Sequence, residues 1–238
     1  MSFFVEGKPA RQPFLRAPAS VLSLIGVLIA AHLLRILAPP ILAEQILNDY
    51  ALDPVRYAGH AVAAGSVLAN VLPLFTHMFL HANATHLAVN SVWLLAFGPI
   101  VARRFGGPAF ILFFVLCGLA GAALFVALNW GEDVGVIGAS GAISGLMGAA
   151  IRMMRLRQPY LNVATMPLMP ILSSQALSFS AVWLAINLAT GLTGLGTGGQ
   201  VEPVAWQDHM GGYLAGLLLA GPFEAVFGLS ARRGRDQA

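Results

Sequence analysis

Charged residues are scarce in this chain. Only 10% of its 238 residues are Asp, Glu, Lys or Arg, whereas 58% are hydrophobic and the mean hydropathy is +0.77. A soluble globular domain carries about 25% charged residues, because its surface faces water. The composition therefore excludes a soluble domain. It also excludes a disordered chain, which needs low hydrophobicity and high net charge, and it predicts a membrane protein with several spans.

Cysteine is almost absent, since Cys117 is the one thiol and lies inside an apolar run. A single cysteine supports neither a disulfide framework nor a cysteine-built metal site. His77, His81 and His86 are close enough in sequence to be considered as metal ligands, but no carboxylate or cysteine lies near them and no H-E-x-x-H motif occurs. We therefore expect no metal and no other cofactor.

Long, mostly apolar stretches predict the fold class. A spanning helix needs about 20 mostly apolar residues, and six stretches qualify as spans: 17–34, 85–101, 105–131, 134–151, 177–195 and 204–227. Residues 38–84 are apolar without forming a convincing span, which predicts a partly immersed outer loop between the first two helices. The prediction is an all-α, six-transmembrane-helix bundle over residues 17–228, between a cytoplasmic N-terminal segment (1–16) and a cytoplasmic basic tail (229–238).

The placement of the basic residues supports six spans. With that number, 11 of the 13 Lys and Arg residues fall on one side of the membrane. By the positive-inside rule this side is the cytoplasm, so both termini are predicted to be cytoplasmic. These residues are spread over several loops instead of one face, so the net charge of +3 predicts no nucleic-acid partner. One lysine against 12 arginines favours a GC-rich bacterial source, and hence a bacterial inner membrane.

Polar residues occur inside three of the predicted spans. His86 and Asn90 are four apart and share a face of the second helix, Ser140 lies in the fourth, and His209 lies in the sixth. Counted from helix starts at residues 134 and 204, Ser140 and His209 lie roughly 7–10 Å below the outer helix ends. Polar groups in a membrane are costly and mark functional sites, so a shared level predicts one site.

Glycines predict that the fourth and sixth helices touch. Gly141 and Gly145 lie on one stripe of the fourth helix, and Gly212 and Gly216 lie below His209 on one face of the sixth. Small residues at this spacing allow membrane helices to approach closely. Contact between the two stripes would place the Ser140 hydroxyl against the His209 imidazole.

A serine beside a histidine predicts acyl-transfer chemistry. A hydroxyl is a weak nucleophile until a base takes its proton, and histidine does this near neutral pH. Asp208 precedes His209, but neighbouring helical positions point about 100° apart, so we expect Asp208 at the membrane interface and a Ser-His dyad. Developing negative charge needs hydrogen-bond donors. His86, Asn90 and backbone N–H groups near Ser140, including Gly138, are the candidate oxyanion hole.

Three motifs resemble those of the rhomboid intramembrane serine proteases, and in the same order. They are HLAVN with His86 and Asn90, GASGAISGLMG with Ser140, and DHMGGYLAG with His209, Gly212 and Gly216. The resemblance covers about residues 20–225. It implies Ser140 as nucleophile, His209 as base, and His86 and Asn90 in the oxyanion hole. It also implies cleavage of transmembrane substrates near the outer membrane face, with entry from lipid gated by the fifth helix and an outer loop.

The chain departs from the family pattern at two positions. The fourth residue after the nucleophile is often aromatic, but here it is Ser144. The residue before the base histidine is often small, but here it is Asp208.

Two alternative functions come from other classes. A catalytically inactive rhomboid-like membrane-protein binder would be expected to lack the serine or the histidine, and both are present. A small transporter would need a polar path to the inner face, where the spans are apolar. The expected partners are transmembrane protein substrates and membrane lipids; the sequence leaves the oligomeric state open.

Overall fold

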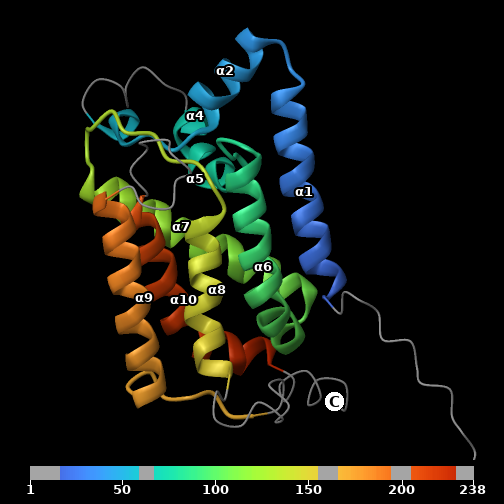
Figure 1. Cartoon of the computed structure of the whole chain (residues 1–238), viewed down its shortest axis with the longest axis vertical. Coiled ribbons are helices and arrows are strands. Elements are labelled where there is room, and N and C mark those ends of the chain that lie inside the picture. The colour runs from blue at the N-terminus through green and yellow to red at the C-terminus, as the bar shows by residue number, and fades with distance from the viewer. Residues whose placement is uncertain (1–16, 59–66, 155–165, 194–204, 229–238) are drawn as a thin grey trace, which may run out of the picture.

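A computed structural model describes residues 17–58, 67–154, 166–193 and 205–228. The predicted terminal segments 1–16 and 229–238 lie outside these residues. The long helices run alternately up and down the molecule (Figure 1), and they are α1 (Ala19–Ile36), α6 (Ala84–Phe105), α7 (Gly107–Leu128), α8 (Ser140–Met153), α9 (Ser174–Thr193) and α10 (Trp206–Phe227). Within the described ranges, the β pairing consists of one isolated bridge between Leu52 and Val136.

Four helices in the described ranges are long and apolar enough to cross a membrane, namely α1, α6, α7 and α10. They contain 18 to 22 residues, which at about 1.5 Å per residue matches a hydrocarbon core about 30 Å thick. The all-α membrane class is therefore confirmed, and four of the six predicted spans meet these criteria. α8 has 14 residues and is about 21 Å long, so it is shorter than the hydrocarbon core.

The predicted start of the fourth span was wrong. Residues 134–139 are not helical, and Ser140 is the first residue of α8. Val136 instead exchanges backbone hydrogen bonds of 2.8 and 3.1 Å with Leu52. Gly138 then has a φ of +131°, a conformation that glycine adopts without the steric cost of a Cβ. The pairing and the glycine together keep residues 136–138 out of the helix, and Ala139 then turns into α8.

The outer segment between α1 and α6 folds into short helices at one end of the molecule (Figure 1). They are α2 (Pro40–Tyr50), η1 (Pro54–Tyr57), α4 (Val67–Val71), α5 (Pro73–Thr76) and η2 (His77–Phe79). Arg35, at the end of α1, donates to the carbonyls of His81 and Ala82 at 2.8 and 3.0 Å. These bonds connect α1 to the segment that leads into α6.

The buried His77 stabilises the outer segment through hydrogen bonds of its ring and its backbone carbonyl. Burial lowers the pKa of His77 to about 4, so the ring is neutral at pH 7. Its Nδ1 lies 2.8 Å from the carbonyl of Pro73, and because a carbonyl only accepts, this nitrogen carries the proton. The backbone carbonyl of His77 accepts the N–H of Gly138 at 2.9 Å. The outer segment and the non-helical segment before α8 therefore support each other.

α8 lies at the centre of the bundle and contacts α6, α7, α9 and α10. Its contact with α10 is a backbone contact at two levels, because a Cβ added to Gly212 would meet the carbonyl of Gly141, and one added to Gly216 would meet that of Gly145. Membrane helices approach this closely only where side chains are absent or small. The glycine stripes thus set α8 directly against α10.

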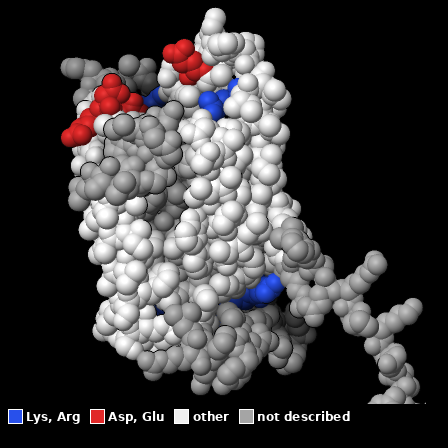
Figure 2. Space-filling model, viewed as in Figure 1, with Lys and Arg blue, Asp and Glu red and all other residues white. Residues whose placement is uncertain are grey.

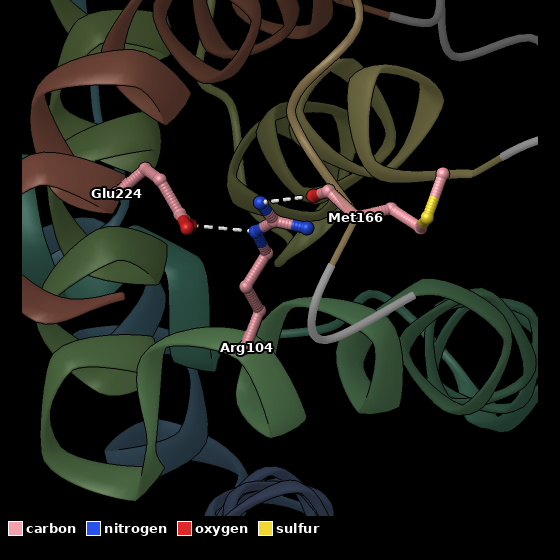
Figure 3. Close-up of polar contacts among 3 residues, drawn as sticks. All are labelled: Arg104, Met166 and Glu224. Carbon is pink, nitrogen blue, oxygen red and sulfur yellow. Dashed lines mark hydrogen bonds and ion pairs between the residues drawn. The ribbon is translucent and has the colours of Figure 1, made fainter. Parts of the chain in front are cut away.

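An ion pair joins three segments at the opposite end of the molecule. Arg104, at the end of α6, is 2% exposed, and its Nε donates to Oε2 of Glu224 on α10 at 2.6 Å (Figure 3). Its Nη2 donates to the carbonyl of Met166, ahead of α9, at 2.7 Å. On the face shown in Figure 2, the acidic side chains lie in two groups at the end of the molecule that carries α2, and the middle of the molecule is uncharged. This uncharged belt is the surface expected of a membrane domain.

The ion pair makes a prediction about stability. Glu224→Ala removes the carboxylate partner of a buried guanidinium, and we expect the free energy of unfolding in detergent micelles to fall by about 3 kcal/mol. The control is Glu44→Ala, because Glu44 lies on the exposed surface of α2; its expected change is under about 0.5 kcal/mol. Equal changes in the two variants would show that the ion pair does not stabilise the fold.

Candidate active site

Ser140 and His209 lie side by side at the starts of two helices. Ser140 is the first residue of α8 and His209 is the fourth residue of α10. The Oγ of Ser140 lies 2.7 Å from Nε2 of His209, which is hydrogen-bonding distance. The glycine contacts one and two turns below bring the two helices close enough for this bond. The structure therefore brings together the two residues predicted as nucleophile and base.

His86, Ser140 and His209 lie at one level for a different reason from the one predicted. His86 is the third residue of α6, so it lies in the first turn of its helix, as Ser140 and His209 do in theirs. The residues meet because three helices start close together, not because each side chain lies several residues inside a span.

A cavity of about 680 Å³ opens onto Ser140 and His209, within the size range of small-molecule and cofactor sites. Its polar wall includes His86, Asn90 and Asn187. Its apolar walls come mainly from α6 and α9, with Val89, Trp93, Phe97, Phe179, Val182, Trp183 and Ile186. The cavity is therefore a mostly apolar space whose polar lining includes the serine and the histidine.

His86 and Asn90 are held by contacts of the first turns of α6. Asn83 precedes the helix and its side chain accepts the N–H of His86 at 2.9 Å, a regular N-cap. Nδ2 of Asn90 donates to the carbonyl of His86 at 2.9 Å, and Asn90 is 4% exposed. A primary amide has two N–H donors, so one of them is left to face the cavity.

Gly138 does not have the donor role predicted for it. Its N–H already donates to the carbonyl of His77 and is not available to a developing oxyanion. The residue instead leaves room for a neighbour, because a Cβ at Gly138 would come within 2.9 Å of Cε1 and Nε2 of the His86 ring. The backbone donor in this region is the N–H of Ser140, which has no acceptor within α8 because it lies in the first turn.

Asp208, predicted at the membrane interface, is buried inside the protein. It is 1% exposed, and its carboxyl group lies between the backbones of Gly121 on α7 and Gly141 on α8. The two glycines leave the space that this carboxyl group fills. Its position agrees with the prediction that it does not orient the His209 ring.

Asn187 was not predicted as a site residue. It is the side chain on α9 whose Oδ1 lies 2.8 Å from Nδ1 of His209, and it is 6% exposed. The signal was available in the sequence, because an amide stands in the otherwise apolar run AVWLAINLA. A polar residue within a membrane span marks a functional site. This criterion identified residues in the second, fourth and sixth spans, and it also identifies Asn187 in the fifth.

Comparisons with known proteins identify the family. The family model described as "Rhomboid domain" matches residues 68–224, which is more than half of the chain. The chain therefore belongs to the rhomboid family, and with its apolar helices it is a multi-pass membrane protein. At family level, the comparisons support a membrane protease.

Three relatives illustrate the similarity. "RHOMBOID-like protein 6, mitochondrial" of Arabidopsis thaliana is 33% identical over 149 residues, or 61% of this chain and 41% of that protein. "Putative rhomboid protease YdcA" of Bacillus subtilis is 31% identical over 122 residues, or 51% of this chain and 61% of that protein. "Rhomboid protease GluP" of Bacillus subtilis is 37% identical over 79 residues, 33% of this chain and 15% of that protein. The match thus spans less than two thirds of each relative's length.

Proposed function

We propose that this rhomboid-family chain is a serine endopeptidase that hydrolyses peptide bonds in or near transmembrane segments of other membrane proteins. The observation that carries the proposal is the 2.7 Å hydrogen bond between Ser140 and His209, at the edge of a cavity that opens between membrane helices. A hydroxyl paired with a neutral imidazole is an activated nucleophile. Within a mostly apolar cavity, the corresponding electrophile is the carbonyl of a membrane-embedded peptide bond.

The reaction has two halves. In the first, His209 Nε2 takes the proton of Ser140 as Oγ bonds to the scissile carbonyl carbon, and the carbonyl electron pair moves onto oxygen. His209 then gives the proton to the leaving amine, the C–N bond breaks, and an acyl-Ser140 ester is left. In the second, water takes the place of the amine: His209 removes a proton from the water as its oxygen bonds to the acyl carbon. The ester C–O bond then breaks, His209 returns the proton to Ser140 Oγ, and the product leaves as the carboxylic acid.

The oxyanion formed in each half needs donors, and we assign these to the His86 ring, the free amide N–H of Asn90 and the backbone N–H of Ser140. All three residues line the cavity beside Ser140 Oγ. Removing one oxyanion donor from a protease typically lowers kcat by about 10²–10³-fold. We therefore expect His86→Ala and Asn90→Ala each to lower kcat within this range, while KM for a transmembrane substrate changes little. A change in KM alone would assign these residues to substrate binding.

The surface beside the cavity supports a transmembrane segment as the substrate. Exposed apolar side chains line both sides of the opening, including Val89 and Trp93 on α6 and Val182 and Ile186 on α9, which are 46–61% exposed. Lipid contact explains such exposure without cost, and an apolar helix would pack on the same side chains. We propose that the substrate enters from lipid between α6 and α9.

We also propose the finer topology. It has six spans within residues 17–228, both termini in the cytoplasm, the outer segment 38–84 partly in the membrane, and a bacterial inner membrane as the location. The exposed apolar side chains of Ile41 and Val67, 75% and 81% exposed, support partial immersion. In a Cys117→Ala background, a membrane-impermeant thiol reagent added to intact cells should react with Glu132→Cys but not with Arg233→Cys. The reverse labelling would overturn the orientation.

The proposed activity is tested with the purified chain in liposomes and a single-span protein tagged differently at its two ends. A soluble peptide with the residues of its outer flank is the control. We expect cleavage of the single-span protein into two fragments, with the cut near the outer face, and slower or no cleavage of the peptide. An intact substrate that copurifies with the chain would favour the inactive binder. Solute uptake without cleavage would favour the transporter.

A further inference from the structure

Resting on the proposed function, we infer that Asn187 of α9 is a positioning residue that holds His209 in the tautomer needed to accept the proton of Ser140. Catalysis through a neutral histidine requires the proton on Nδ1 and a lone pair on Nε2. Either ring nitrogen of a neutral histidine can carry the proton, and a hydrogen bond from a neighbouring residue determines which one does. A third residue has this role in serine and cysteine protease sites.

The hydrogen bonds around Asn187 determine its orientation. Its Nδ2 lies 3.1 Å from the backbone carbonyl of Trp206, which precedes His209 by three residues. A carbonyl only accepts, so the NH₂ end of the amide has to face Trp206. The amide oxygen then faces His209 Nδ1 at 2.8 Å. If the amide were reversed, its oxygen would face the carbonyl oxygen of Trp206, and two acceptors would lie together. Only one orientation of the amide is therefore consistent with both contacts.

This orientation fixes the histidine proton. An amide oxygen cannot donate, so Nδ1 of His209 has to carry the hydrogen that bonds it. In the neutral ring that the proposed mechanism requires, Nε2 is then unprotonated and faces Ser140 Oγ at 2.7 Å as an acceptor. The order of donors is therefore Asn187 to Trp206, His209 to Asn187, and Ser140 to His209. Each bond in this series determines the next, and the last is the one that activates the nucleophile.

The site also explains why an amide stands here. Asn187 is 6% exposed on an apolar helix, where a carboxylate would be costly in a membrane. Asp208, the neighbouring carboxyl group, faces Gly121 and Gly141 and is not placed to orient the ring. An asparagine supplies the acceptor without a charge. Because it belongs to α9, the bond also requires α9 to be packed against α10 when the proton moves.

The test compares Asn187→Leu and Asn187→Asp with a matched control. Leucine keeps the approximate size but cannot accept a hydrogen bond, and aspartate keeps the acceptor. The control is Ser180→Ala, which removes a hydrogen bond from α9 to α10 that does not involve Asn187, the 2.7 Å contact of Ser180 with the Tyr213 hydroxyl. The stacking of Trp183 on Tyr213, with ring centroids 4.2 Å apart, holds the two helices together in that control.

We expect kcat for a transmembrane substrate to fall about 10–100-fold in Asn187→Leu, with KM unchanged and at least partial recovery in Asn187→Asp. Ser180→Ala should keep the parent kcat. The rate at which a fluorophosphonate labels Ser140 should fall in parallel with kcat. Parent-like kcat in Asn187→Leu, or an equal loss in Ser180→Ala, would overturn the inference. If the parent neither cleaves nor is labelled, the proposed function itself fails.

Discussion

Ser140→Ala is expected to lower the rate of substrate cleavage in liposomes by about 10⁴-fold or more, to the background rate. The expected loss is large because the hydroxyl is the attacking group, and no other group in the site replaces it. Ser144, one turn further along α8, also lines the cavity. The hydrogen bond of His209 Nε2, however, goes to Ser140.

The matched control is Ser91→Ala. Ser91 is also a serine in a membrane helix, but its hydroxyl donates to the carbonyl of Leu87 in the same helix at 2.8 Å, and it is not part of the cavity wall. We expect the parent rate in this variant. Ser140→Ala should retain the parent's thermal unfolding midpoint in detergent, because removing one partly exposed hydroxyl leaves the packing of α8 intact. Cleavage at the parent rate by Ser140→Ala would exclude Ser140 as the nucleophile.

Gly216→Leu is expected to separate α8 from α10 and to abolish both stable folding and activity. Any Cβ at this position meets the backbone carbonyl of Gly145, and backbone atoms cannot move aside as a flexible side chain does. Even Gly216→Ala should lower the free energy of unfolding by about 1–3 kcal/mol, and the leucine variant should exceed this. The measurement is unfolding in detergent together with the cleavage rate.

Gly26 is the matched control for that experiment. It also lies in a membrane helix, α1, but a Cβ there would have no atom within 4 Å. Gly26→Leu should therefore fold and cleave as the parent does. Similar destabilisation in the two leucine variants would mean that glycine as such, and not the contact between α8 and α10, explains the loss.

Much of the site could be predicted from local sequence spacing. His209 shares a helical face with Gly212 and Gly216, and Ser140 adjoins the stripe of Gly141 and Gly145, so close packing of the two glycine pairs brings the two side chains together. The same spacing places His86 above Asn90 on one face of α6. Helix periodicity is a local property, and these predictions needed little beyond it.

Other features depend on contacts between distant segments. α8 starts at Ser140 because Val136 pairs with Leu52, which lies far away in the sequence. The burial of Asp208 depends on the space beside Gly121, on another helix. Asn187 meets His209 only through the packing of α9 on α10. Hydropathy places each of these residues in or near a span, but hydropathy does not indicate which residue of another segment each one contacts.

The most direct test of the central claim is the site and rate of reaction with a serine-directed fluorophosphonate, measured by the mass of the labelled peptide. The claim is that His209 activates Ser140 for nucleophilic attack. It predicts the adduct on Ser140 in the parent and labelling at least about 100-fold slower in His209→Ala. An adduct on another serine, or labelling of Ser140 at the same rate without His209, would contradict it.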